Sequence, residues 1–118
     1  MYTYNPKLIR IIDGDTVDAM IDLGFDVWVK NRIRLSGIDT PETRTRNLIE
    51  KAKGFEAKNR LVEILDKSGG DFVIISEGRD KYGRCLGEIF VENISINQLL
   101  LDEGFAIPYN GGKKPKIK

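Results

Sequence analysis

Three short segments of this chain bring acidic and basic side chains together at spacings that could do chemistry. They read IDGDT over residues 12–16, RLSGIDTPE over residues 34–42 and DKYGR over residues 80–84. Each also has a plain structural interpretation. DGDT is an ordinary turn between strands, DTPE an ordinary loop or helix start, and DKYGR an ordinary hairpin turn. Taken singly, each segment is better explained as a turn, so the chemical interpretation depends on all three together.

The histidine and cysteine counts restrict the chemistry open to these segments. The chain has no histidine and one cysteine, Cys85. Without imidazole there is no Ser-His or Cys-His nucleophile pair and no histidine-based zinc site. One cysteine cannot form an internal disulfide, so stability must come from packing. Any hydrolysis must therefore use carboxylates, guanidinium groups, ammonium groups or a hard metal ion.

The distribution of charge is more informative than the net charge. Nineteen basic and eighteen acidic residues give a formal charge of +1, which is not the strongly basic footprint expected of a nucleic-acid binder. Residues 1–27 carry two basic and five acidic side chains, whereas residues 28–60 carry nine basic and four acidic ones. An acidic cluster followed by a basic segment suits a site that holds both a cation and a polyanion.

Length and composition indicate one globular domain. The chain has 118 residues, of which 41% are hydrophobic, enough for a single core. We expect residues 1–110 to form that domain and the lysine-rich residues 111–118 to be a basic, disordered tail. The polar opening, residues 1–7, has no apolar segment typical of a secretory signal, which favours an intracellular protein but leaves the compartment unknown.

The elements that must position the three segments begin with a strand meander. Residues 15–22 and 26–35 alternate apolar and polar side chains with the period of two that is typical of a strand with one buried face. In the second run, Val27, Val29, Ile33 and Leu35 share one face, while Trp28, Lys30, Arg32 and Arg34 share the other. Residues 8–13 predict a preceding strand, and residues 23–25 a turn.

The second half of the chain predicts helices around a strand pair. Residues 54–66 have apolar positions at three- and four-residue spacings, which indicates an amphipathic helix, whereas residues 43–53 could be a mobile loop or extra helical turns. Residues 71–76 and 85–92 predict two strands around a turn at residues 78–83. Ser95 and Gln98 form an S-x-x-Q capping box for a short helix that Gly104 ends.

Strands followed by packed helices favour an α+β fold that is mainly β. About five strongly twisted strands close most economically into a small barrel, so we expect a five-stranded OB-fold β-barrel with two to three packed α-helices.

The order and spacing of the three segments resemble the staphylococcal nuclease-like (thermonuclease) family, whose fold is a five-stranded OB barrel with packed helices. The resemblance extends from about residue 7 to residue 109 and includes the stretch from Glu42 to the Gly54-Phe55-Glu56-Ala57 helix start without an obvious gap. It implies a calcium-dependent, sugar-nonspecific nuclease that hydrolyses phosphodiester bonds in DNA or RNA and leaves 3′-phosphates.

The resemblance assigns a metal site to oxygen ligands. Asp15 and Asp39 match the calcium-ligating carboxylates, and Thr40 matches the residue whose main-chain carbonyl completes the protein's share. Because Ca²⁺ takes about six to eight oxygens, three from the protein leave room for waters and a phosphate oxygen. Asp13 is expected to support the site from outside the ligand set.

The resemblance also assigns catalysis and substrate binding. Glu42 matches the glutamate that orients or deprotonates the attacking water, and Arg34 and Arg84 match the two arginines that clamp the phosphate and stabilise the transition state. Lys81 and Tyr82 match positions that contact a neighbouring nucleotide phosphate. Tyr109 lies near the base-stacking tyrosines, although the closely spaced tyrosine pair of the family is not reproduced.

Other residues have both a functional and a structural interpretation. Trp28 could stack on a base, although partial burial against a helix is the simpler expectation, and Arg32, Arg44 and Arg46 could touch distant phosphates or form a solvated basic surface. Cys85 is in phase with apolar residues of its strand and indicates a core position.

Two functions therefore stay open. The first is the nuclease, with DNA or RNA as substrate, Ca²⁺ as cofactor and a monomer as the default. The alternative is a noncatalytic OB-fold module that binds nucleic acid or protein, since such barrels commonly do so. Intact carboxylates and arginines favour the nuclease.

Overall fold

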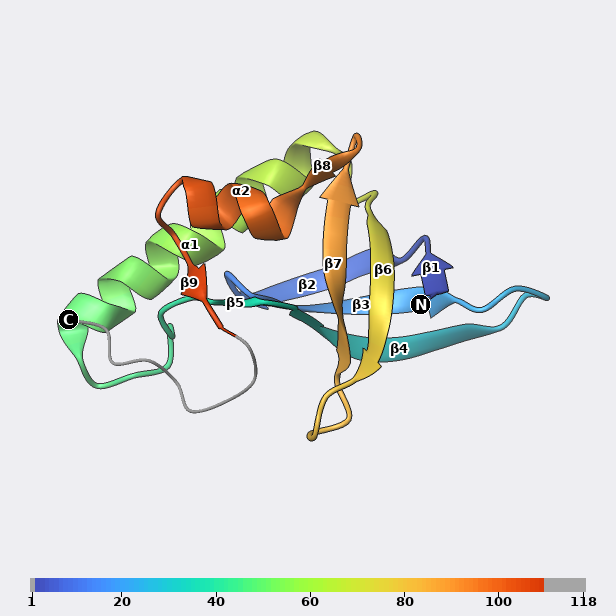
Figure 1. The fold of residues 1–118 in the computed structure, drawn as a ribbon, viewed down its shortest axis with the longest axis horizontal. Helices are drawn as coiled ribbons and strands as arrows, with labels where there is room; N and C mark the ends of the chain where they lie inside the picture. The colour runs from blue at the N-terminus through green and yellow to red at the C-terminus, as the bar shows by residue number, and fades with distance from the viewer. Residues whose placement is uncertain (1, 110–118) are drawn as a thin grey trace.

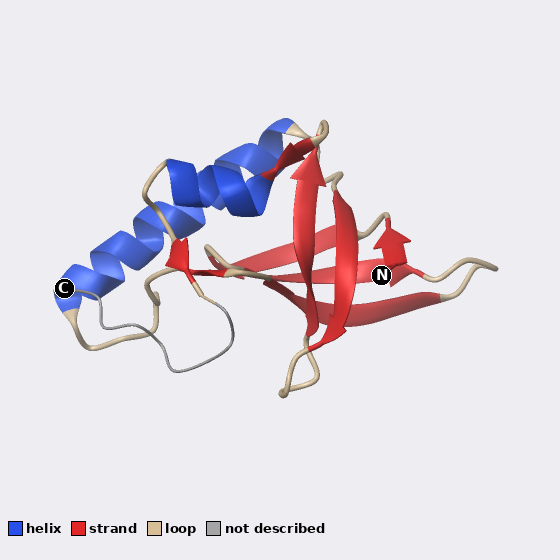
Figure 2. Ribbon diagram, viewed as in Figure 1, coloured by secondary structure: helices blue, strands red, loops and turns tan. Residues whose placement is uncertain are grey.

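The computed structural model describes residues 2–109. The fold is mainly β with two helices (Figure 2). The elements are, in order, β1 (Tyr2–Tyr4), β2 (Lys7–Asp13), β3 (Thr16–Asp22), β4 (Trp28–Leu35), β5 (Ile38–Asp39), α1 (Leu48–Lys67), β6 (Val73–Arg79), β7 (Cys85–Val91), β8 (Ile94–Ser95), α2 (Ile96–Asp102) and β9 (Ile107–Pro108). The basic tail that we expect at residues 111–118 lies outside the described residues.

The predicted meander is confirmed. Strands β2, β3 and β4 pair antiparallel in sequence order, with Val17 opposite Ile11 on one side and Ile33 on the other. The face pattern of β4 is confirmed at its C-terminal half, where Ile33 and Leu35 are fully buried, but Val27 lies before the strand and is half exposed. The strand itself begins two residues later than predicted, because the turn extends to Asp26.

A parallel pairing joins this meander to the second strand pair. Residues Ile33, Arg34 and Leu35 of β4 align with Cys85, Leu86 and Gly87 of β7, and β6 pairs with β7 on its other side. The sheet runs in the order β1-β6-β7-β4-β3-β2, with β8 attached to β7. This path is not closed, so the five-stranded barrel expected from the sequence is not confirmed (Figure 1).

Helix α1 begins six residues earlier than the apolar pattern indicates. Asn47 caps it by accepting hydrogen bonds from the backbone N–H groups of Ile49 and Glu50, which supplies partners that the first turn otherwise lacks. The extra helical turns, rather than a loop, therefore occupy residues 48–53. Their apolar residues Leu48 and Ile49 are exposed, which explains why no helical period was visible there.

Helix α2 has the predicted start and end. The Ser95 hydroxyl accepts from the N–H of Gln98, as the capping box requires. The Gln98 side-chain amide donates to Asp102, however, rather than accepting from the backbone N–H of Ser95. Gly104 follows the helix with φ of 80°, a conformation that suits glycine. An ion pair from Arg60 to Glu103 ties α1 to the end of α2.

The core lies between the sheet and the two helices. Its fully buried side chains come from β3, β4, β6, β7, α1 and α2, namely Val17, Ile33, Ile74, Ile89, Leu61 and Leu100. Cys85 is buried among them, as predicted. Neither helix in the part of the chain that the structure describes combines the length and apolar character needed to traverse a bilayer.

An ion-pair cluster on the outer face of the meander makes stability depend on pH. Asp18 is 3% exposed and accepts from Arg32 and Arg10 at 2.9 Å each. Hydrogen bonds from Arg32, and then from Arg10, outweigh the effect of burial and lower the pKa of Asp18 from 3.8 to about 2. Because the folded-state pKa is depressed, the stabilisation is present above pH 3.8 and is lost as the pH falls through about 2.

We expect Asp18→Asn to lower the free energy of unfolding at neutral pH by about 1–2 kcal/mol, since both arginines are partly exposed. Urea unfolding of the two proteins between neutral pH and about pH 2 checks this. The gap between them should be widest above the ordinary aspartate pKa and should shrink as the solution becomes more acidic. Asp22→Asn, at an exposed position of the same strand, is the control, and equal gaps at all pH values would contradict the assignment.

Candidate active site

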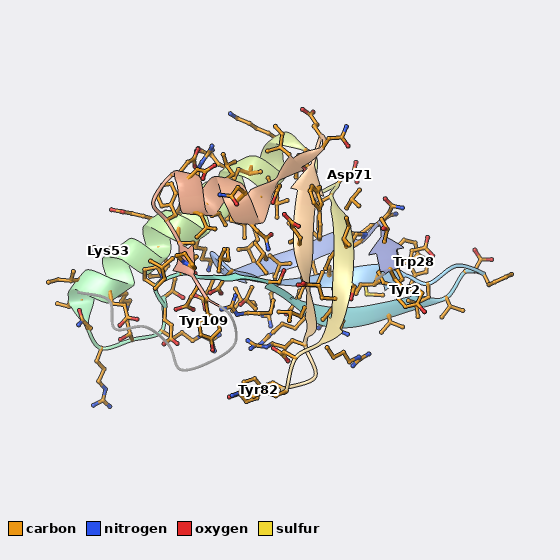
Figure 3. The ribbon with its side chains drawn as sticks, in the orientation of Figure 1. Tyr2, Trp28, Lys53, Asp71, Tyr82 and Tyr109 are labelled. Carbon is orange, nitrogen blue, oxygen red and sulfur yellow. The ribbon has the colours of Figure 1, made fainter. Side chains whose placement is uncertain are left out.

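The residues assigned by resemblance lie together at one end of β4, although they come from five separate segments of the chain. A pocket of about 210 Å³ is lined by Asp13, Asp15, Thr16, Arg34, Asp39, Thr40, Glu42, Arg84 and Tyr109. A second pocket of about 510 Å³ adjoins it, shares Arg34, Arg84 and Tyr109, and adds Lys81 and Tyr82. Figure 3 shows Tyr109 and Tyr82 on the same side of the sheet. The structure thus brings all nine predicted site residues to two adjoining pockets.

Arg34 forms the centre of the smaller pocket. Its Nη2 lies 3.4 Å from Oδ2 of Asp15 and 3.3 Å from Oδ1 of Asp39, and its Nη1 donates to the carbonyl of Leu35 at 2.8 Å. All three charged residues are at most 8% exposed. Two buried carboxylates beside one guanidinium leave an excess of negative charge, which favours a cation close by.

Strand ends fix the two carboxylates. Asp15 occupies the tight turn between β2 and β3, where its Oδ1 accepts from the Thr16 hydroxyl and its Oδ2 from the N–H of Thr40 at 3.0 Å. Asp39 ends β5, which pairs with β9. The hydrogen bond to Thr40 therefore holds the turn and the DTPE segment at a fixed separation.

Oxygen atoms of these segments could hold a hard metal ion. Thr40 is 1% exposed, and its hydroxyl oxygen has no hydrogen-bond partner among the described residues. No group of three or more Asp, Glu, His or Cys side chains within residues 2–109 has metal-binding geometry. A metal here would thus take two carboxylates and a non-acidic oxygen from the protein.

The loop that carries Glu42 is anchored on both sides. Asp13, at the end of β2, accepts from the hydroxyl of Thr43 at 2.7 Å and from its N–H at 3.3 Å. Asp13 thus holds the Thr43 end of this loop. On the other side, Gly54 of α1 lies directly against the Glu42 backbone, where a Cβ would sit 2.5 Å from the Glu42 carbonyl oxygen and 2.9 Å from that of Pro41.

The close approach of Gly54 to the Glu42 backbone allows the role of Glu42 to be tested from a distance. Alanine is normally more favourable than glycine in a helix interior. At Gly54, however, the added Cβ would overlap the Pro41–Glu42 backbone, so Gly54→Ala must push that backbone outward. If Glu42 acts in catalysis, a displacement of about 1 Å should lower kcat by about 10- to 100-fold. Steady-state kinetics with a circular dichroism check of folding tests this, and Lys53→Ala, the exposed neighbouring position, is the control. Unchanged kcat in a folded Gly54→Ala variant would contradict the role of Glu42.

Arg84 is held by Asp80, the first residue of the DKYGR segment, to which the sequence assigned no role. Asp80 accepts from Nε of Arg84 at 2.6 Å and from the backbone N–H groups of Tyr82 and Arg84 at 2.9 Å. Burial raises the pKa of Asp80, but the hydrogen bonds from Arg84 and Tyr82 outweigh it, so that its pKa lies below the usual value. Asp80 thereby fixes the side chain of Arg84, which lines both pockets. The four-residue spacing within the hairpin turn was the available signal.

Aromatic side chains surround the larger pocket. The guanidinium of Arg34 lies 5.8 Å from the ring centre of Tyr109, and that of Arg84 lies 5.3 Å from the ring centre of Tyr82. Lys81 also lies over the Tyr82 ring, which is 72% exposed. Tyr109 therefore reaches the site despite the missing tyrosine pair, and Lys81 and Tyr82 form its solvent-exposed rim.

A buried amide joins the elements behind the site. Asn97 of α2 accepts from the N–H of Ile89 and donates to the carbonyls of Ser36 and Gly87. Ser36 directly follows the strand that carries Arg34, so this network fixes the corner between β4 and β5. No motif or period marks Asn97 in the sequence beyond its place in a short helix.

Comparison with known proteins finds matches over most of the chain. The family model described as "Staphylococcal nuclease homologue" matches residues 32–118. Endonuclease YncB of Bacillus subtilis is 36% identical over 104 residues, which are 86% of this chain and 46% of that protein. The SPbeta prophage-derived endonuclease YokF of the same organism is 36% identical over 84% of this chain and 32% of its own length. The thermonuclease of Staphylococcus hyicus is 31% identical over 85% of this chain and 56% of its own length.

Proposed function

Because this chain belongs to the staphylococcal nuclease homologue family, we propose that it hydrolyses phosphodiester bonds of DNA or RNA with the help of a bound Ca²⁺. The chain spans about half the length, or less, of several curated relatives that it matches, so its activity and substrates are inferred from its own site. The observation that carries the proposal is the single pocket around which Asp15, Asp39, Glu42, Arg34 and Arg84 meet.

The residues at the pocket fit a calcium ion. The carboxylates of Asp15 and Asp39 would hold it together with an oxygen of Thr40, whose buried hydroxyl has no partner in the described part of the chain. Oxygen donors, with open coordination positions for water and a phosphate oxygen, are the set that Ca²⁺ prefers. When bound, the metal would neutralise charge on the phosphate and help to orient the attacking water.

The side chains of this protein supply the remaining steps. Glu42 is exposed at the pocket rim, where its carboxylate accepts the proton of the attacking water. The water oxygen bonds to phosphorus while the bond to the 5′ oxygen breaks, and the departing 5′ oxygen takes a proton from solvent water, which leaves a 3′-phosphate and a 5′-hydroxyl. Arg34 and Arg84 stabilise the added negative charge of the transition state, because guanidinium groups donate paired hydrogen bonds and stay charged at all working pH values.

Degradation assays test the function directly. We expect the purified protein to degrade single-stranded DNA, duplex DNA or RNA with Ca²⁺ and to be inactive with a chelator. Mapping the product ends then shows whether the phosphate remains on the 3′ side. Absence of cleavage with every substrate, while nucleic acid still binds, would replace this proposal with the noncatalytic module.

A further inference from the structure

The outward face of β4 carries a line of three cationic side chains and one tryptophan that leads away from the pocket. Because alternate residues of a strand share one face, Trp28, Lys30, Arg32 and Arg34 point the same way. The first three are exposed, whereas Arg34 is buried in the site. At about 3.3 Å per residue the line from Trp28 to Arg34 is about 20 Å long. We call these four residues the β4 stripe.

Neighbouring strands add charge to the stripe. Arg10 of β2 shares Asp18 with Arg32, so two guanidinium groups meet one carboxylate there. Lys7 lies beside Trp28, and Asp22, opposite Trp28 in the sheet, accepts from the N–H of Gly24. The cations on this surface outnumber the carboxylates, which gives it the positive charge that attracts a polyanion.

The stripe is continuous with the phosphate clamp. A hollow of about 480 Å³ is lined by Asn31, Arg32, Tyr82, Gly83 and Arg84. It joins the middle of β4 to the hairpin that carries Arg84. A chain of phosphates held between Arg34 and Arg84 can therefore continue over Arg32 without crossing an apolar surface.

The far end of the stripe presents an aromatic ring. Trp28, which is labelled in Figure 3, lies near the end of the sheet that is farther from the helices. Its side chain is 38% exposed, and the ammonium of Lys7 lies 5.3 Å from its ring centre. The sequence favoured partial burial against a helix, and the ring contact that the structure shows is with Lys7 of β2. Trp28 and Lys7 also line a hollow of about 720 Å³. An aromatic ring beside a cation is the combination with which single-strand binders hold a base and its phosphate.

We propose that the β4 stripe binds the part of a single-stranded nucleic acid that flanks the scissile phosphate, with a base stacked on Trp28. This inference rests on the proposed function for the location of the scissile phosphate. Successive cations on one strand face are separated by about 7 Å, a spacing comparable to that of phosphates in an extended single strand. Stacking on Trp28 requires an unpaired base, so the preferred substrate is single-stranded and several nucleotides long.

Trp28 allows the proposal to be tested without catalysis, because it is the one tryptophan of the chain. The protein is titrated in chelator with a twelve-nucleotide single strand, with its duplex form and with a dinucleotide, while intrinsic fluorescence and the anisotropy of a label on the nucleic acid are recorded. We expect the long single strand to quench Trp28 strongly, and the duplex and dinucleotide to quench it much less.

Substitutions then test the contribution of each end of the stripe. Trp28→Ala should weaken binding of the long strand by about tenfold, as expected for loss of one stacked base. Lys30→Gln should lower the slope of log affinity against log salt by about 0.7, the value for one phosphate contact of a single strand. The matched control is Lys53→Gln on α1, at the opposite end of the molecule from Trp28 in Figure 3, which should bind like the parent chain.

Each outcome separates the stripe from the nuclease. The stripe would be overturned, even if the protein is an active nuclease, by either of two results. The first is that the long strand binds without quenching Trp28, and the second is that neither the affinity of Trp28→Ala nor the salt slope of Lys30→Gln differs from that of the parent chain. Quenching with the expected losses would support the stripe even if no cleavage occurs, and only the proposed function would then be rejected. Failure of the long single strand to bind at all would also overturn the stripe.

Discussion

Replacing Arg84 by alanine is expected to lower kcat by about a thousandfold or more while the protein stays folded. The side chain lies at the end of the β6–β7 hairpin, where Asp80 fixes its Nε and both pockets include it. Removal of one well-placed donor to a developing negative charge costs about 10²- to 10³-fold, and removal of an arginine from phosphoryl transfer can cost more. Single-turnover cleavage at saturating substrate, with circular dichroism and thermal unfolding beside it, measures the effect.

Two further variants show that this loss concerns the phosphate. Arg84→Lys keeps the charge but loses the planar fork, so we expect it to recover only a small part of the activity. Arg79 is an exposed arginine of the same hairpin, but it lines neither of the two pockets. Arg79→Ala should therefore retain the parent kcat. A folded Arg84→Ala variant with near-normal kcat would exclude the clamp.

Loss of Asp39 is the second large effect that we expect. Asp39→Ala removes one of the two carboxylates proposed to hold Ca²⁺ and should weaken calcium affinity by about a hundredfold or more. It also leaves Arg34 with Asp15 as its remaining carboxylate partner in the pocket. Isothermal titration calorimetry with Ca²⁺ measures the affinity directly.

Calcium-dependent stability provides an independent measurement. Ligand at a hundred times its dissociation constant stabilises a folded protein by about 2.7 kcal/mol, so the parent chain should show a clear rise in Tm with Ca²⁺. Asp39→Ala should lose that rise, whereas Asp66→Ala, at an exposed position of α1, should keep it. Equal calcium affinity in the Asp39→Ala and parent chains would place the metal elsewhere.

Periodicity predicted the parts of the fold in which one side of an element is buried. The alternation through Val17, Ile33 and Leu35 gave the central strands, because burial of one face imposes a period of two. The same rule failed at the start of α1, where Leu48 and Ile49 are exposed and the helix depends on the Asn47 cap. Phe55 and Val62 belong to the apolar spacing of residues 54–66 yet are about 40% exposed, since the helix meets the sheet along a narrower stripe.

The site was predictable where a short motif carries the chemistry. The segments that hold Asp15, Asp39 and Arg84 supplied the residues, and the structure brings them together as expected. Their supports were harder to predict. Asn97 acts through tertiary contacts that leave no local period or motif, and Gly54 acts through its close approach to the Glu42 backbone. For Asp80, the four-residue spacing to Arg84 was a signal, but it did not by itself assign a role. Whether the sheet closes into a barrel could not be predicted from the sequence either, since the number of strands does not determine whether the edge strands β1 and β2 pair.

The parallel pairing of β4 with β7 ties the site to the kinetics of folding. The two arginines of the clamp, Arg34 and Arg84, are fifty positions apart in the sequence. Arg34 lies in β4 and Arg84 directly precedes β7, so the pairing of these two strands closes the long segment of chain between the arginines. Hairpins form from local contacts, whereas closing a loop of this length costs chain entropy before any contact repays it. The β2–β3–β4 meander and the β6–β7 hairpin can thus form early, while the phosphate clamp exists only after they dock. Recovery of cleavage during refolding therefore reports completion of the native topology rather than the appearance of secondary structure.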